Sequence, residues 1–275
     1  MTKIIDGKKV SQLIKEELTN IVKDMTIKPH LAVIKVGDDS ASEIYVNAKR
    51  KDALEIGIDF TKIELPDNIS EELLLTEINN LNENNSISGI IVQLPLPKHL
   101  NERKILNSID FNKDVDGLSL SSIGALYADE DTNIPCTAMA VIKLLHHYSL
   151  EINGKNVVIV GRSNLVGKPL SALMLKENAT VTVCHSKTKN LIEYTKNADI
   201  LISAVGKKNL INFSMVKENV IIIDVGITRD NGKIYGDVDF DNVYYKCSYI
   251  TPVPGGVGPM TRVMLLENVV KNVKR

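Results

Sequence analysis

The sequence predicts an α/β protein with two domains. Short apolar runs of strand length alternate with helix-length segments along most of the chain, which is typical of parallel sheets covered by helices. The chain has 275 residues, and a length of this size favours two domains. A polar, irregular stretch around residues 127–135 separates an N-terminal three-layer α/β domain from a Rossmann-type domain, and we expect an active-site cleft between them.

The first half contains three expected strands and three expected helices. Apolar residues recur at helical spacing over residues 8–23, which predicts the first helix. A second helix is expected to begin near Ser40 or Ser42 and a third to run from Ser70 to Asn84, because a serine hydroxyl can cap a first turn. The strands are the β-rich runs 31–36, 58–65 and 89–94.

The second half has the pattern of a doubly wound dinucleotide-binding domain. A helix over residues 138–147 is followed by β-rich runs at 156–160, 180–184, 200–204 and 220–224. A Gly/Pro loop, residues 252–259, precedes a last amphipathic helix over residues 260–273. The expected boundaries are residues 1–136 with about 258–275 for the first domain, and residues 137–257 for the second.

Composition excludes several classes of partner and cofactor. With 33 Lys and Arg against 34 Asp and Glu, the formal net charge is −1, so neither nucleic acid nor a membrane surface is expected as a partner. No run approaches the length of a membrane span or a secretion signal, and we expect a cytoplasmic protein. The three cysteines are dispersed, and no metal-ligand spacing occurs, so we expect reduced thiols and no metal.

A glycine-rich turn directly follows the first strand of the second half. A glycine at the strand end allows a sharp turn, a second glycine at the helix start lets the backbone approach a pyrophosphate, and free N–H groups there attract negative charge. The spacing is not GxGxxG, so a tight turn without a ligand is the alternative. The expected cofactor contacts in this turn are Gly161, Arg162, Ser163, Val166, Gly167 and Pro169.

The end of the next strand indicates which dinucleotide binds. An NAD-binding domain usually presents an acid there to the ribose 2′-hydroxyl. This sequence instead has His185, Ser186, Lys187 and Thr188, with no acid. A hydroxyl and a cation, joined by Arg162, suit a 2′-phosphate, so NADP is favoured over NAD. An ordinary solvated loop is the alternative.

Candidate catalytic residues lie in the first half. Tyr45 and Lys49 are four residues apart on a predicted helix and therefore share one face. Gln93 closes an apolar strand at its carboxyl end, where ligands of open α/β sheets bind, and Asp116 lies in a following loop. The alternatives are a routine surface charge for Lys49 and a turn-forming residue for Asp116.

Four segments together resemble the signature segments of bifunctional methylenetetrahydrofolate dehydrogenase/methenyltetrahydrofolate cyclohydrolases. They are residues 42–51 (SEIYVNAKRK), 89–97 (GIIVQLPLP), 113–117 (KDVDG) and 252–261 (PVPGGVGPMT), in this order and with the loop at Gly161. The resemblance implies that NADP takes a hydride from 5,10-methylenetetrahydrofolate and that water then opens the methenyl product to 10-formyltetrahydrofolate. It also implies tetrahydrofolate derivatives as ligands and a homodimer, with the strand near Val181 and Val183 as the expected edge.

The resemblance further implies a role for each candidate. Lys49 is the expected general acid/base, held in position by a hydrogen bond with Gln93, while Tyr45 stacks along the folate and Asp116 accepts hydrogen bonds from its pteridine. The remaining expected substrate contacts are Leu94, Pro95, Pro252, Gly255 and Gly256, and the remaining expected cofactor contacts are Ala204, Val205, Gly206, Gly226 and Ile227.

The sequence departs from the family pattern at Ser122 and Ala125, where the pattern has Asn and Arg, and at Ala138, where it has Pro. These departures concern the domain junction and affinity rather than the proton-transfer residues. A dehydrogenase with slow hydrolysis is the first alternative function. A dinucleotide-sensing binding protein without chemistry is the second.

Overall fold

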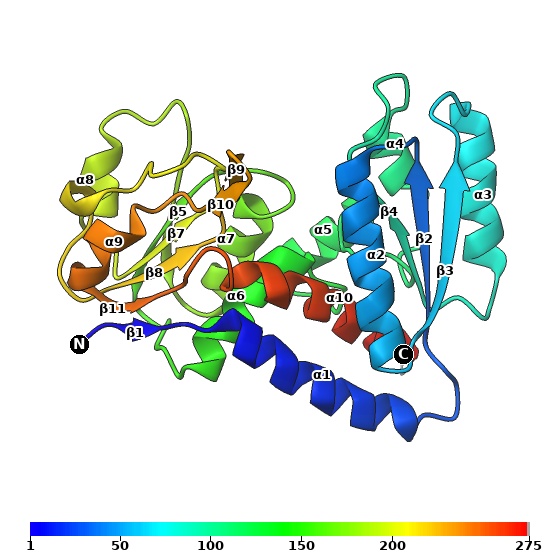
Figure 1. The fold of residues 1–275 in the computed structure, drawn as a ribbon, viewed down its shortest axis with the longest axis horizontal. Coiled ribbons are helices and arrows are strands. Elements are labelled where there is room, and N and C mark those ends of the chain that lie inside the picture. Colours follow the sequence, from blue (N-terminus) through cyan, green and yellow to red (C-terminus); the bar gives the residue numbers. More distant parts are fainter. Residues whose placement is uncertain (274–275) are drawn as a thin grey trace. The chain divides into compact units, whose positions relative to one another are not determined.

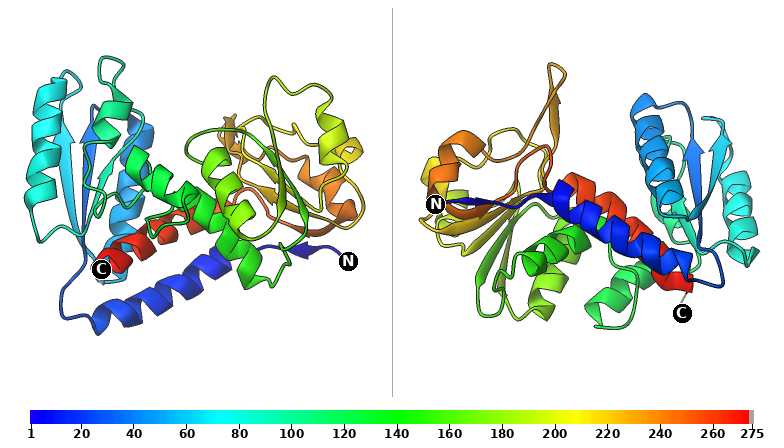
Figure 2. Two further views of the ribbon diagram at one scale, coloured as in Figure 1. Left: turned by 180° about the vertical axis from the view of Figure 1, so that it is seen from behind. Right: turned by 60° about the horizontal axis from the view of Figure 1, so that its bottom comes forward.

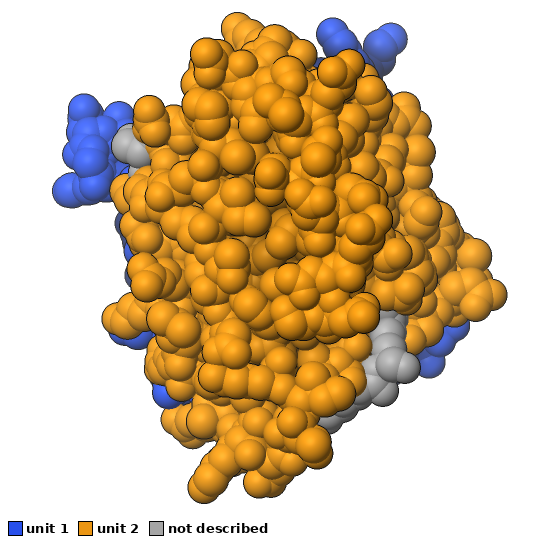
Figure 3. Space-filling view, turned by 90° about the vertical axis from the view of Figure 1, so that its right-hand side faces the viewer, with its two compact units in different colours: residues 1–12, 137–261 blue, residues 13–136, 262–275 orange. Residues whose placement is uncertain are grey.

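The computed structural model describes residues 1–273, apart from the side chains of residues 40 and 41. The chain forms two compact units, which are coloured separately in Figure 3. Unit 1 comprises residues 1–12 and 137–261, and unit 2 comprises residues 13–136 and 262–275. Residues 1–12 and 258–261 thus fall in unit 1, whereas the predicted boundaries place them in the first domain. Strand β1 (Lys3–Ile4) pairs with β11 (Cys247–Ile250) of unit 1. Residues 274 and 275, the last two of the predicted first domain, lie outside the described residues.

Unit 2 is built on a three-stranded parallel sheet. Its strands are β2 (His30–Val36), β3 (Asp59–Leu65) and β4 (Gly89–Val92), in the order β3-β2-β4. Helices α2 and α3 cover opposite faces of this sheet (Figures 1 and 2). The helices that contribute residues to this unit are α1 (Gly7–Lys23), α2 (Ser40–Glu55), α3 (Glu71–Glu83), α4 (Glu102–Leu106), α5 (Leu120–Tyr127) and α10 (Val257–Val273).

Strand β2 shows why the strands of unit 2 are continuous apolar runs in the sequence. Ala32 and Ile34 belong to one core cluster with Leu74 and Ile78 of α3. Val33 points to the other face by the two-residue period of a strand and is fully buried as well. Both faces of a parallel sheet are covered by helices, so polar residues do not alternate with apolar ones here.

Unit 1 contains a six-stranded parallel sheet in the order β1-β11-β8-β7-β5-β6. Its additional strands are β5 (Asn156–Val160), β6 (Thr180–Cys184), β7 (Ile200–Ser203) and β8 (Val220–Asp224), and a two-stranded antiparallel hairpin is formed by β9 (Thr228–Asp230) and β10 (Lys233–Tyr235). The remaining helices are α6 (Cys136–His147), α7 (Gly167–Lys176), α8 (Leu191–Thr195) and α9 (Phe240–Val243), with single 3-10 turns η1 (Phe213–Met215) and η2 (Tyr244–Lys246).

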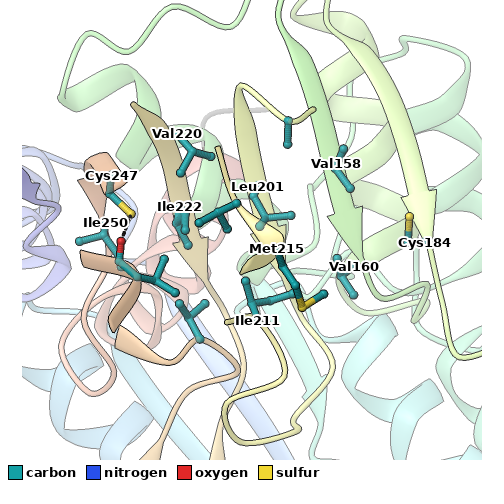
Figure 4. Packing of buried hydrophobic residues seen from close by; sticks show 14 residues of the cluster. Val158, Val160, Cys184, Leu201, Ile211, Met215, Val220, Ile222, Cys247 and Ile250 are labelled. Atoms are coloured by element: carbon teal, nitrogen blue, oxygen red, sulfur yellow. Dashed lines mark hydrogen bonds between the residues drawn. The ribbon is translucent and has the colours of Figure 1, made fainter. Parts of the chain in front are cut away.

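The sheet of unit 1 has a buried apolar face, part of which Figure 4 shows. Val158 of β5, Leu201 of β7 and Ile222 of β8 pack in one cluster with Met215 and Ile250. Strands β6 and β7 pair with opposite edges of β5, so the chain reverses its direction of progress across the sheet at β5. This arrangement creates the topological switch point at which open α/β sheets bind ligands. The predicted two-domain α/β fold is confirmed.

Candidate active site

Helix α2, which carries Tyr45 and Lys49, is fixed at its N-terminal end. The Asp39 side chain caps the helix by accepting the Ser42 N–H at 2.7 Å. One turn further on, the Glu43 carboxylate pairs with Lys35 of β2 at 2.9 Å and with Lys62 of β3 at 2.7 Å. The hydrogen bonds from Lys62 and Lys35 lower the pKa of Glu43 to about 2, so this anchor stays charged at neutral pH.

The other end of α2 is held by Asp52, whose side chain is buried. One carboxylate oxygen accepts from Nζ of Lys15 on α1 at 2.5 Å, and the other accepts from Nε of Arg262 on α10 at 2.6 Å. Lys49 lies one turn before Asp52, between the two anchors. The position of its side chain is therefore set by a helix that two sets of ion pairs fix.

Lys49 and Gln93 are joined directly. Nζ of Lys49 donates to Oε1 of Gln93 at 2.9 Å. The Gln93 amide cannot turn freely, because its Nε2 donates to the Leu94 carbonyl at 2.7 Å and its backbone N–H donates to Ile34 of β2 at 2.8 Å. The amide therefore offers its oxygen, and not its nitrogen, to the lysine. The expected hydrogen bond between these two side chains is present.

Asp116 lies in a loop whose shape is set by the buried carboxylate of Asp114. The backbone N–H groups of residues 117–119 donate to this carboxylate at 2.9 to 3.3 Å. A parallel bridge between Ile90 and Asp114 places the loop alongside β4, the strand that leads to Gln93. The loop and the lysine–amide pair thus belong to one region of unit 2.

Ser122, one of the departures from the family pattern, is part of the same network. Its side chain is fully buried in α5, and its hydroxyl donates to Oδ2 of Asp114 at 2.7 Å. The same hydroxyl accepts from Oγ of Ser119 at 3.0 Å, while Ser119 caps the helix by accepting the Ser122 N–H. The sequence predicts only that this departure concerns the domain junction and affinity, whereas the structure makes Ser122 a partner of the acid that orders the Asp116 loop.

Asp116 itself is half-buried, and its electrostatic surroundings involve three other side chains. Burial raises the pKa of its carboxyl, the charge of Lys49 opposes this rise, and Asp114 adds to it. The thiol of Cys136 donates to the carbonyl of Val115, the residue before Asp116, at 3.6 Å. Burial and the Asp116 charge raise the pKa of Cys136 well above its ordinary value, so this cysteine stays a thiol. Sequence reasoning did not place Cys136 at the site, because nothing in the spacing connects it to Asp116.

The other expected substrate contacts are distributed over both units. In unit 2, Tyr45 is exposed, Leu94 is half-buried and Pro95 is exposed. Pro252, Gly255 and Gly256 belong to unit 1. There the Gly255 carbonyl accepts the Lys8 N–H at 3.0 Å, and a β-carbon on Gly256 would overlap the Pro252 carbonyl. Glycine is therefore required at 256 by close backbone packing.

The predicted cofactor turn lies at the switch point of unit 1. Gly161 follows β5 with a φ of +125°, and a β-carbon there would overlap the carbonyl of Ala204, which follows β7. A β-carbon on Gly167 would overlap the Gly161 carbonyl. Helix α7 begins at Gly167, and its N-cap residue Val166 makes no side-chain cap hydrogen bond. Close backbone packing thus requires both glycines and places the start of α7 at the end of the turn, and a helix start is where a pyrophosphate can bind.

The loop after β6 lies beside this turn, because the Gly161 N–H donates to the Cys184 carbonyl at 2.8 Å. The loop is closed by Thr188, whose hydroxyl accepts the His185 N–H at 2.8 Å. Arg162, Ser186 and Lys187 are exposed. Within residues 1–273, no carboxylate pairs with Arg162 or with Lys187. Positive charge is thus available on both loops for a 2′-phosphate.

The remaining expected cofactor contacts follow β7 and β8. Val205 and Ile227 are exposed. Gly206 has a φ of +72° and lies next to Ile227, whose carbonyl would be 3.6 Å from a β-carbon on this glycine. Gly226 has no room for a β-carbon, which would overlap the Asp237 carboxylate. All of these residues therefore lie in loops at the carboxyl ends of the unit 1 strands.

Two features define a dinucleotide-dependent α/β enzyme. Unit 1 has a parallel sheet with a glycine-rich turn at its switch point, and unit 2 has a lysine, Lys49, whose position is fixed by a hydrogen bond to Gln93. Within residues 1–273 there is no cluster of metal-ligating side chains, and no described helix has the length and apolar character to span a membrane.

The chain belongs to the tetrahydrofolate dehydrogenase/cyclohydrolase family. The family's catalytic-domain model matches residues 5–116, and its NAD(P)-binding-domain model matches residues 135–275. A Campylobacter hominis protein named bifunctional protein FolD is 52% identical over 98% of this chain and 97% of its own.

Two solved structures are similar over nearly their whole length. The bifunctional dehydrogenase/cyclohydrolase FolD of Campylobacter jejuni has a TM-score of 0.98 at 49% identity, covering 100% of this chain and 99% of its own. The Trypanosoma brucei dehydrogenase-cyclohydrolase, solved with NADP and an inhibitor, has a TM-score of 0.94 at 39% identity, covering 100% of this chain and 98% of its own.

Proposed function

We propose that this chain catalyses two consecutive reactions of one-carbon metabolism. The first is the NADP-dependent oxidation of 5,10-methylenetetrahydrofolate to the methenyl compound, and the second is its hydrolysis to 10-formyltetrahydrofolate. The observation that carries the proposal is the hydrogen bond from Nζ of Lys49 to an anchored Gln93 amide, beside Asp116. A family member that kept only nucleotide binding would not need this arrangement.

On the folate side, Lys49 serves as the general acid/base of hydrolysis. Water adds to the methenyl carbon, and Lys49 moves the proton that allows the ring to open. Gln93 holds the ammonium through a neutral amide oxygen, which leaves the other two donors of Lys49 for water and substrate. The carboxylate of Asp116 accepts hydrogen bonds from the donor-rich edge of the pteridine, and Tyr45 supplies an aromatic face. Leu94 and Pro95 complete the contacts from this unit.

On the cofactor side, the geometry of unit 1 fits NADP. The two glycines let the turn pack closely against backbone, so that a pyrophosphate would bind at the start of α7. Arg162, Ser186 and Lys187 would hold the 2′-phosphate. When bound, NADP accepts the hydride of the first reaction. The nitrogen lone pairs of the folate stabilise the cation that forms, so positioning carries this step. Arg162→Ala should therefore weaken NADP much more than NAD.

The decisive experiment compares both activities in the wild type and in Lys49→Gln. Formation of NADPH reports oxidation, and decay of the methenyl compound without NADP reports hydrolysis. We expect the variant to lose hydrolysis and to keep part of the oxidation, because only hydrolysis needs proton transfer by Lys49. Equal retention of both activities would refute the role of the lysine. A wild type without either activity would refute the proposed function.

We further propose that the protein is a cytoplasmic homodimer that pairs through β6. This strand is one edge of the six-stranded sheet, and Val183 on it is exposed. The three cysteines are buried thiols, in keeping with a reducing compartment. Val183→Lys should shift the protein toward monomer in light scattering after gel filtration. An unchanged mass would rule out this edge.

A further inference from the structure

Unit 1 contains two buried carboxylates that the proposed mechanism does not use. Asp224 is the last residue of β8 and is 3% exposed, and Asp237, just after β10, is fully buried. Within residues 1–273, no lysine, arginine or histidine pairs with either of them. A buried carboxylate without a counter-ion is unfavourable unless hydrogen-bond donors surround it. The donors around these two acids therefore indicate what they do.

Asp237 holds the loop that follows β7. Its Oδ2 accepts from the hydroxyl of Ser203 at 2.8 Å and from the N–H of Val205 at 2.7 Å. Its Oδ1 accepts from the N–H of Lys207 at 2.7 Å. Three donors from five consecutive residues converge on one carboxylate, which leaves the loop between them little freedom. Gly206 lies inside this loop with its φ of +72°.

Asp224 holds the loop that follows β8, and it also holds Asp237. Its Oδ1 accepts from the N–H groups of Gly226 and Asp237 at 3.0 Å each, and its Oδ2 accepts from the N–H of Val238 at 2.9 Å. The two acids therefore act in series, because Asp224 fixes the backbone that presents Asp237, and Asp237 fixes the loop after β7.

The neighbouring glycines fit this interpretation. A β-carbon on Gly226 would overlap the Asp237 carboxylate, and a β-carbon on Gly236 would overlap the Asp224 carboxylate. Neither of these glycines needs a positive φ, so their small size is required by the two acids. The segments 224–226 and 236–238 are thus packed around the carboxylates.

We infer that Asp224 and Asp237 are positioning residues for NADP, which set the conformation of the loops after β7 and β8 without touching the reacting atoms. These loops lie at the carboxyl ends of strands beside the switch point, where the dinucleotide of a doubly wound sheet binds. A carboxylate suits this task because both of its oxygens accept, whereas an amide would turn an N–H donor toward another donor. The inference rests on the proposed function, since it concerns the cofactor of the first reaction.

The test is Asp237→Asn, which keeps the shape of the side chain and removes one acceptor. The matched control is Asp241→Asn, the same chemical change at an exposed position of α9. For both variants we would measure oxidation at varied NADP, hydrolysis of the methenyl compound without NADP, and NADP binding by calorimetry. We expect Asp237→Asn to raise the KM and Kd for NADP by about tenfold, with a smaller change in kcat and with hydrolysis retained. Asp241→Asn should behave as the wild type.

A second variant covers the case in which Asp237→Asn does not fold. Ser203→Ala removes one of the three donors and keeps the charge, so it should raise the KM for NADP in the same direction by a smaller factor. An unchanged KM for NADP in a folded Asp237→Asn, or an equal loss of both activities in Ser203→Ala, would overturn the inference. Failure of the proposed function is distinguishable, because it would appear as the absence of both activities in the wild type.

Discussion

The substitution Ser122→Ala tests whether this departure from the family pattern supports the folate side of the enzyme. Ser122 is fully buried, and its hydroxyl donates to the Asp114 carboxylate at 2.7 Å. A hydrogen bond to a charged group contributes about 1.5–3 kcal/mol. The backbone N–H groups of residues 117–119 still donate to Asp114 in the variant. We therefore expect the free energy of unfolding to fall by about 2 kcal/mol, toward the lower part of that range.

The functional consequence follows from the loop that Asp114 orders. A looser loop presents Asp116 less well to the pteridine, so the KM for folate should rise in oxidation and hydrolysis alike. The assay is urea denaturation together with initial rates of both activities at varied folate. Ser121→Ala is the matched control, because Ser121 is the exposed neighbour in α5, and its unfolding free energy should change by less than about 0.5 kcal/mol.

If Ser122→Ala matches Ser121→Ala in stability and in the KM for folate, the Ser122 hydroxyl supports neither the fold nor the Asp116 loop. A variant in which only oxidation suffers would equally contradict this role, because both reactions use the same folate contacts. A loss of stability with an unchanged KM would separate the packing role of Ser122 from its effect on Asp116, and would contradict the second step of the argument.

Two further substitutions test other buried carboxylates. Asp52→Asn should lower the unfolding free energy by about 3 kcal/mol in urea denaturation, because it leaves Arg262 without its charged partner and Lys15 with the more exposed Glu55 alone. A change below about 1 kcal/mol would show that α2 is held mainly by other contacts. Burial raises the pKa of the Asp224 carboxyl from 3.8 to about 7. The folded protein therefore binds this proton more tightly than the unfolded chain does, and the stability gained from the proton is lost as pH rises from about 4 to 7. The unfolding free energy of the wild type minus that of Asp224→Asn should therefore fall across this window, and a constant difference would contradict the raised pKa.

The regular elements could be predicted from the sequence because their residues repeat with the period of a strand or helix. Strands β5, β6 and β8 occupy the predicted residues, and α3 begins directly after the predicted cap Ser70. Elements without a period were not predicted. Strand β1 has two residues and forms only because β11 offers a partner from the far end of the chain. Helix α2 begins at Ser40, within the predicted range, but the sequence does not show that Asp39 is its cap, since several neighbouring residues have the same capping chemistry.

The contact between Lys49 and Gln93 could be predicted, because side-chain type and the end of a strand carry information there. The residues that order the site were not predictable in the same way. Asp114, Asp224 and Asp237 look like ordinary turn-forming acids in the sequence, because a sequence shows the acceptor but not the N–H groups that converge on it. The same holds for Cys136, whose hydrogen bond to the Val115 carbonyl beside Asp116 depends on how the loop folds.

In each unit, buried carboxylates accept hydrogen bonds from backbone N–H groups and thereby order the loops proposed to bind folate or NADP. Hydrolysis requires folate, water and Lys49, whereas oxidation also requires NADP. A weakened Asp114 network should therefore affect both reactions, and a weakened Asp237 network should affect oxidation alone. The two networks share no residues, so their effects on kcat/KM for oxidation should multiply in the double variant Ser122→Ala, Asp237→Asn. Hydrolysis in the double variant should match that of Ser122→Ala, and any further loss there would show that Asp237 does more than position NADP.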